Sequence, residues 1–170
     1  FTKDQYYNAL DFLQKKIADG FIRQVKGNDY KEDLISGDAV ACIAWSGDAF
    51  QLAAENDGKF DFAIPESGGT ISADNFIIPS TVKAETKSKV EELINYYYDP
   101  MVAAKVAAYV NYICPVQGAQ EAMAKVDPSL VNNELIFPTA KTQSKLHVFR
   151  NLTPAEETEF TDAFQKATGN

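Results

Sequence analysis

Asp74 is the charged residue whose surroundings point most directly to a function. It stands amid an apolar run within the stretch Phe60–Pro79, and a charge in such a run is expensive unless it meets a partner. A carboxylate in this place either caps a turn or a helix N-terminus, or is aimed into a cleft that receives a cationic ligand. The sequence by itself supports both interpretations.

Three further side chains lie where predicted elements end or break. Trp45 and Asp48 follow an apolar strand-like run and open a helix, and ligands of open α/β sheets bind at such strand ends. Trp45 is either a core anchor or the apolar wall of a site. Asp48 is either a helix N-cap or a ligand contact, and the two roles are compatible. Tyr112 lies in an irregular segment, where a phenol is either a core filler or a cleft donor.

The elements that must position these residues indicate an α/β fold. The unbroken apolar run Ala39–Ala44 suits a parallel strand, and the alternation in Phe60–Ile64 suits a half-buried one. We expect these two strands to be neighbours in one sheet, and Ser72–Ile78 to leave that sheet after a glycine-rich turn. Helices are expected over Asp4–Ala18, Tyr30–Ser36, Asp48–Asn56, Lys87–Tyr98, Met101–Val110, Ala119–Lys125 and Pro154–Thr168.

Composition limits the classes of partner. The 170 residues are 45% hydrophobic and carry a formal net charge of −8, which is enough apolar material for one domain or two small lobes. The negative charge argues against nucleic acid or an anionic membrane surface as partner. No apolar run approaches transmembrane length and no signal peptide is recognisable. The start at Phe1 suggests a fragment or a processed product.

The cysteines and the histidine, which could serve in catalysis or metal binding, are not grouped in this sequence. Cys42 and Cys114 lack the spacing of a zinc site. Cys42, within an apolar run, is expected to be a buried free thiol, with a disulfide as the open alternative. His147 is the single histidine and is more typical of a structural residue than of a general base. Motifs for phosphate loops, nucleophile elbows, dinucleotide binding and zinc proteases are absent, so we expect no enzyme, cofactor or metal site.

An ordered set of motifs gives the chain a family likeness. They are Trp45-Ser46-Gly47-Asp48 after an apolar strand, Ile64-Pro65-Glu66-Ser67-Gly68-Gly69, Asp74-Asn75 before Ile78-Pro79, a helix running into Asp99-Pro100, Tyr112, Pro115 and Leu135–Pro138. In this order they resemble the spermidine/putrescine-binding proteins of bacterial ABC importers. The likeness covers nearly the whole chain.

The resemblance implies an α/β, type II periplasmic-binding-protein-like fold. In that fold two lobes joined by crossover strands hold a ligand between them, and this chain looks like the C-terminal portion. Residues 1–71 would then belong to the second lobe, and residues 72–80 would form the hinge crossover strand. Residues 81–143 would belong to the first lobe, and residues 144–170 would return to the second lobe and its C-terminal helix.

The resemblance also implies a role for each candidate residue. Trp45 would pack on the methylene chain of a polyamine, and Asp48 would contact an amine. Asp74 would pair with a ligand ammonium, with Tyr112 near the same end. Aromatic faces attract alkylammonium groups and carboxylates neutralise them, so the chemistry is consistent.

Two positions depart from the family pattern. Ser72 stands where the family usually has an aromatic residue, two residues before the aspartate. Arg150 stands near a position where some members make a polar contact, and a guanidinium there would repel a polyamine. These departures bear on the identity of the solute more than on the fold.

The function implied is that of an extracytoplasmic receptor, periplasmic or lipid-anchored. It would deliver putrescine or spermidine to ABC permease subunits without enzymatic activity or a cofactor. The alternatives are a receptor for another small solute, an enzyme using Asp48 and Asp74 as an acid–base pair, and a structural fragment without a complete site. An exposed cleft wall would in addition favour self-association of the chain.

Overall fold

The computed structural model describes residues 1–169, and their contacts divide into two compact units. One unit comprises Phe1–Ile43 together with the chain from Phe149 onward, and the other comprises Ala44–Val148. The first contains α1 (Lys3–Ala18), α2 (Tyr30–Ser36) and α8 (Pro154–Thr168). The second contains α3 (Ser46–Glu55), β1 (Gly69–Thr70), α4 (Ala84–Tyr97), α5 (Pro100–Val110), α6 (Ala119–Val126), the 3₁₀ helix η1 (Pro128–Leu130), α7 (Ala140–Gln143) and β2 (Leu146–His147).

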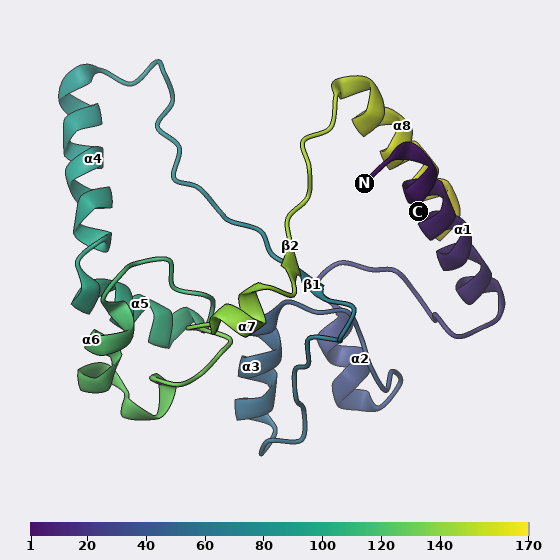
Figure 1. The fold of residues 1–170 in the computed structure, drawn as a ribbon, viewed down its shortest axis with the longest axis horizontal. Helices are drawn as coiled ribbons and strands as arrows, with labels where there is room; N and C mark the ends of the chain where they lie inside the picture. The colour runs from purple at the N-terminus through teal and green to yellow at the C-terminus, as the bar shows by residue number, and fades with distance from the viewer. Residues whose placement is uncertain (170) are drawn as a thin grey trace. The chain divides into compact units, whose positions relative to one another are not determined.

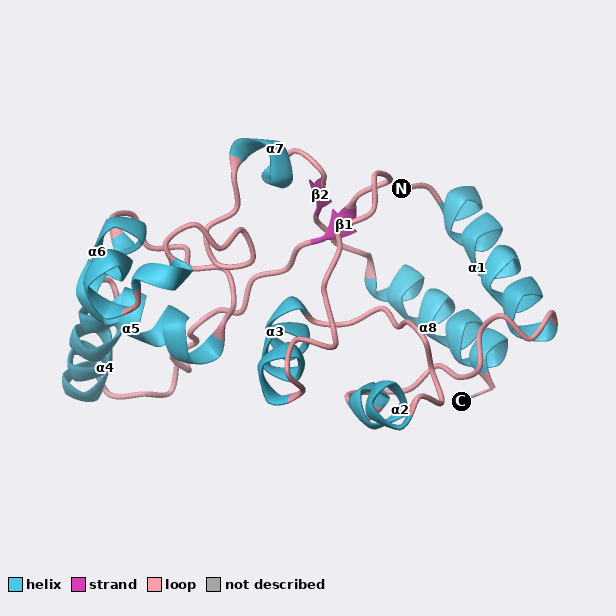
Figure 2. Cartoon of the chain, turned by 90° about the horizontal axis from the view of Figure 1, so that it is seen from below, coloured by secondary structure: helices cyan, strands magenta, loops and turns pink. Residues whose placement is uncertain are grey.

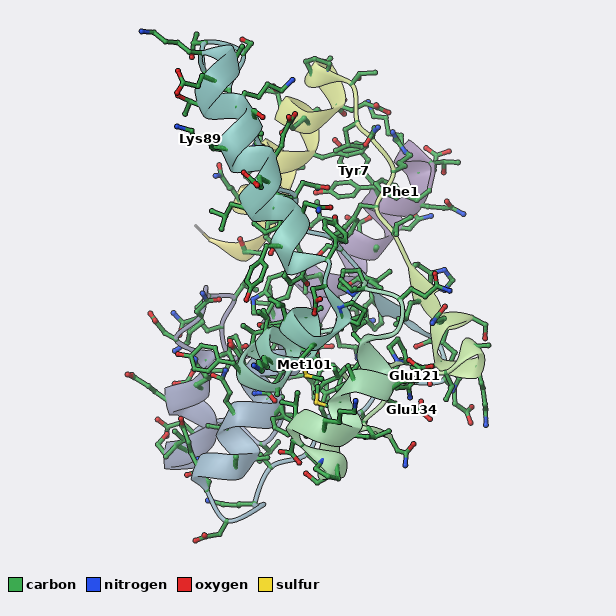
Figure 3. All side chains as sticks on the ribbon, turned by 90° about the vertical axis from the view of Figure 1, so that its left-hand side faces the viewer. Phe1, Tyr7, Lys89, Met101, Glu121 and Glu134 are labelled. Carbon is green, nitrogen blue, oxygen red and sulfur yellow. The ribbon has the colours of Figure 1, made fainter. Side chains whose placement is uncertain are left out.

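The first unit is built on the packing of α1 against α8 (Figure 1). Each helix begins with a capping box, at Thr2 and at Thr153, so both ends form from local signals. The ring of Tyr6 stacks on that of Phe160 with a centroid distance of 4.1 Å, and the Tyr6 hydroxyl donates to the Phe160 carbonyl oxygen at 2.7 Å. Phe1 and Tyr7, labelled in Figure 3, extend this aromatic cluster.

The core of the second unit lies between α5 and α6. The side chains with no exposed surface are Ala103, Ala104, Ala119, Met123 and Ile136. Small alanines on facing helices let the two backbones approach closely. Asp99 caps α5 by accepting hydrogen bonds from the backbone N–H groups of Met101 and Val102. The alanine-rich helix therefore packs as its composition predicts.

The sheet expected between Ala39–Ala44 and Phe60–Ile64 is not formed, so this detail of the predicted α/β fold is wrong. Within residues 1–169 the strand pairing is the short parallel ladder of β1 and β2 (Figure 2). Ala39–Ala44 and Phe60–Ile64 have no regular secondary structure, and no described backbone hydrogen bond joins them. An apolar run becomes a strand only when a neighbour satisfies its backbone groups. Residues 71–79 also lack regular structure, so the hinge strand remains a prediction.

Burial differs from expectation along the same apolar run. Val40 and Ile43 are fully exposed, at 101% and 103%. Cys42 is exposed rather than buried, and both it and Cys114 are free thiols. Without a strand partner or a covering helix, the run has nothing to pack against. None of the helices described is long and apolar enough to cross a membrane.

Candidate functional site

The start of α3 places two of the four predicted site residues. Trp45 occupies the N-cap position in an extended conformation, and Asp48 lies in the first turn. Asp48 is therefore not the N-cap that the sequence suggested, because the helix begins at Ser46. A carboxylate in a first turn is still stabilised by the helix dipole. Trp45 is 54% exposed, so it is not a core anchor.

Tyr112 lies directly against the first turn of α3. A side-chain Cβ built at Gly47 would fall 2.6 Å from the Cζ atom of the Tyr112 ring, which real Cβ atoms do not tolerate. Gly47 is buried within α3. Only glycine lets the ring approach the helix backbone this closely, so Gly47 is part of the site. The sequence signal was present, because glycine in a helix turn is destabilising unless packing requires it.

The electrostatic environment of Tyr112 links it to both predicted aspartates. Partial desolvation raises the pKa of the Tyr112 phenol, although the residue is 39% exposed, and the negative charges of Asp48 and Asp74 raise it further. The hydroxyl also hydrogen-bonds with Asp48, through both the backbone N–H and the side chain. The phenol therefore stays protonated beside two carboxylates and can donate or accept a hydrogen bond. Tyr112, Asp48, with which it hydrogen-bonds, and Asp74, whose charge acts on its pKa, are called the Tyr112 cluster below.

Asp74 reaches this cluster from an irregular, exposed segment. No helix begins at Asp74, so it is not an N-cap. Its neighbour Asn75 donates from Nδ2 to the carbonyl oxygen of Ala73 at 3.2 Å. Residues 71–79 form no helix, strand or turn, so the turn interpretation of Asp74 is not supported. The same segment carries the exposed side chain of Ser72.

Other polar groups have structural partners. The Arg150 guanidinium bonds both carboxylate oxygens of Glu156, at 2.8 and 3.2 Å, and lies 4.8 Å from the centre of the Phe1 ring. Its charge is thus matched inside the first unit. His147 belongs to β2, and its ring lies against the turn at Gly68. Among residues 1–169 no three His, Cys, Asp or Glu side chains gather as metal ligands do.

A separate cavity of about 320 Å³ lies elsewhere in the second unit. It is lined by Phe62, Ile64, Leu135, Lys145 and three neighbouring polar residues. None of the four predicted site residues lines it. The Tyr112 cluster is thus identified by its contacts and electrostatics, not by an enclosed cavity.

Comparison with known proteins gives one family and several relatives. Residues 2–137 match the family model described as bacterial extracellular solute-binding protein. The spermidine/putrescine-binding periplasmic protein of Escherichia coli is 29% identical over 136 residues, covering 80% of this chain and 36% of that protein. A putrescine-binding periplasmic protein of Pseudomonas aeruginosa is 23% identical over 151 residues, covering 86% and 40% respectively.

A second Pseudomonas aeruginosa relative, a putrescine/cadaverine-binding protein, is 25% identical over 131 residues. That match covers 74% of this chain and 35% of the relative. The chain therefore spans little more than a third of the length of the relatives it matches.

Proposed function

Because this chain belongs to the family of bacterial extracellular solute-binding proteins, we propose that it recognises a polyamine, putrescine or spermidine, for an ABC importer. The family resemblance and the extracytoplasmic location expected from the sequence are both confirmed, since the relatives are periplasmic binding proteins. The family is one of transport proteins and not an enzyme class. Recognition of a polyamine by this chain is the proposal.

The observation that carries the proposal is the Tyr112 cluster. It sets two carboxylates beside a phenol that remains neutral, with the exposed Trp45 ring three residues before Asp48 on the same helix start. Carboxylates and a hydroxyl oxygen accept the N–H donors of an alkylammonium group. An exposed indole face attracts the cation and covers its methylene chain. Asp48 and Asp74 would bind the ammonium, with Tyr112 and Trp45 fixing its position.

The proposal includes a place for the chain in a two-lobed fold. Residues 72–80 would be the hinge strand, with residues 1–71 and 144–170 in one lobe and residues 81–143 in the other. This division rests on the family resemblance, and the chain spans little more than a third of each relative. ABC permease subunits would be the macromolecular partners.

Calorimetric titration tests the function directly. Putrescine, spermidine, an amino acid mixture and an organic anion are titrated into the chain, and into any longer form of the protein that its coding sequence provides. Stoichiometric binding of the polyamines alone, without turnover, supports the receptor. Turnover would favour the alternative enzyme with Asp48 and Asp74 as acid and base, and binding of another solute would reassign the ligand.

Asp74→Asn is the sharpest variant for the proposed site. A charge-assisted hydrogen bond is worth about 1.5–3 kcal/mol, so polyamine affinity of a form that contains both lobes should fall roughly tenfold to a hundredfold. In this chain, with one wall of the cleft, the ammonium would stay mostly hydrated and the same change should do little. Glu92→Gln, which removes an exposed carboxylate on α4, is the matched control. Equal affinities of Asp74→Asn and wild type in the form with both lobes would show that Asp74 does not bind the ligand.

A further inference from the structure

Asn111 has an uncommon backbone conformation at the end of α5. Its φ and ψ are 58° and 30°, in the left-handed region, and its N–H donates to the Ala107 carbonyl oxygen at 2.9 Å. Residues with a Cβ avoid this region, and asparagine tolerates it better than most. The Nδ2 group of Asn111 also donates to the carbonyl oxygen of Tyr109 at 3.3 Å. Side chain and backbone thus both fix this turn.

The burial of Asn111 makes the turn energetically unfavourable. The residue is 8% exposed, and its Oδ1 atom has no hydrogen-bond partner among the residues described. A buried acceptor without a donor is destabilising. The residue that follows this turn is Tyr112, whose ring lies against Gly47.

Gly47 provides the space that the Tyr112 ring occupies. The left-handed turn at Asn111 redirects the chain after α5, and the ring of the next residue, Tyr112, then comes to rest where a Cβ of residue 47 would be. One special backbone position sends the ring toward α3, and the other leaves room for it. The two positions are 64 residues apart in sequence, yet both act on the same side chain.

We propose that Asn111 and Gly47 are positioning residues that hold the phenol of Tyr112 beside Asp48 and Asp74, and thereby set the affinity of the cluster for a cation. The binding role rests on the function proposed above, whereas the positioning role does not. Neither residue is proposed to contact the ligand. Both act through Tyr112.

The first measurement follows the ionisation of Tyr112 and needs no ligand. Alkaline titration of tyrosinate absorbance is recorded for each protein and for the same protein carrying Tyr112→Phe, so that the difference isolates this phenol. In the wild type its pKa lies above the ordinary value because of partial desolvation and the two carboxylates. Asn111→Ala and Gly47→Ala should bring it back toward the ordinary value. Asn111→Gly, which accepts the same backbone conformation, should restore the wild-type titration.

The second measurement is putrescine affinity by calorimetry, in a form that contains both lobes of the cleft. Asn111→Ala should weaken binding about tenfold, the order expected for a strained left-handed residue, and Asn111→Gly should recover most of the loss. Asn132→Ala, at an exposed asparagine, serves as the control. Circular dichroism establishes that each variant is folded, and Gly47→Ala provides the independent test should Asn111→Ala not fold.

The two measurements separate the two ideas. Failure to bind putrescine in a form that contains both lobes of the cleft, together with the expected changes in Tyr112 titration, rejects the polyamine function and keeps the positioning role. Wild-type titration of Tyr112 in both Asn111→Ala and Gly47→Ala overturns the positioning role, whatever the binding result.

Discussion

Arg150 and Glu156 form a two-pronged ion pair in the first unit. The Glu156 carboxylate receives two hydrogen bonds from Arg150 and also the backbone N–H of Thr153 at 2.9 Å. The Arg150 hydrogen bonds, followed by those from Thr153, lower its pKa from 4.5 to about 2. Arg150 Nε in addition donates to the Phe1 carbonyl oxygen at 2.9 Å. The arginine that departs from the family pattern therefore has a structural function in joining the chain's first residue to α8.

This pair predicts a defined dependence of stability on pH. A carboxyl group with a lowered folded-state pKa stabilises the fold fully above its unfolded value of 4.5, and loses that contribution as the pH falls toward about 2. Thermal unfolding should therefore show Glu156→Gln less stable than wild type at neutral pH, with the difference shrinking across that acidic window.

Glu157→Gln is the matched control, because Glu157 lies in the same first turn of α8 but is exposed. It should change stability much less than Glu156→Gln. A difference between Glu156→Gln and wild type that stays constant down to pH near 2 would contradict the assigned pKa.

The predicted site residues show what sequence can and cannot give at this scale. Asp48, Asp74 and Tyr112 were chosen from their types and positions; the Tyr112 ring lies against the first turn of α3, which contains Asp48, and the charges of both aspartates raise the pKa of its phenol. Gly47 and Asn111 were missed as functional residues, because their importance lies in a close approach and a left-handed turn. A glycine in a helix turn signals a close approach, but the partner of Gly47, Tyr112, is distant in sequence. The left-handed conformation of Asn111 is not revealed by residue type alone.

At the scale of elements, helices could be predicted because their signals are local. Tyr30–Ser36 and Pro154–Thr168 are bounded as the sequence indicated, and the capping signal at Thr153 lies within four residues of its partner. Strands differ, since Ala39–Ala44 and Phe60–Ile64 have the right patterns but require a hydrogen-bonded neighbour. Local signals are not always realised in full. Asp29, a residue type that favours N-caps, occupies the N-cap position of α2, but its side chain makes no capping hydrogen bond.

The packing of α1 on α8 yields a prediction at this scale. Phe160 is 3% exposed and stacked on Tyr6, whereas Phe164, one turn later, is 40% exposed. Phe160→Ala should lower the free energy of unfolding by about 3–5 kcal/mol, as for a buried aromatic. Phe164→Ala should cost clearly less. Urea unfolding followed by circular dichroism measures both, and equal losses would show that the stacked contact does not dominate.

At the scale of the whole molecule, the apolar run near the end of the first unit is uncovered. Val40 and Ile43 are fully exposed beside the exposed Cys42, and the backbone from Val40 to Ala44 makes no described hydrogen bond to another strand. Extended apolar segments with unpaired backbone groups readily pair with another chain. Burial of apolar surface, at about 25 cal/mol per Å², favours the same outcome.

We therefore expect the chain to self-associate through this segment. Sedimentation velocity with a reducing agent, which prevents disulfides between Cys42 thiols, should show a mass that rises with protein concentration. Ile43→Lys should shift the equilibrium toward monomer, because a charge opposes both apolar burial and edge pairing. Leu93→Lys, at a 69% exposed leucine on α4, should leave the association unchanged. A monomer at every concentration would show that these exposed residues do not drive association, and equal effects of both lysine variants would attribute it to general surface hydrophobicity instead of this segment.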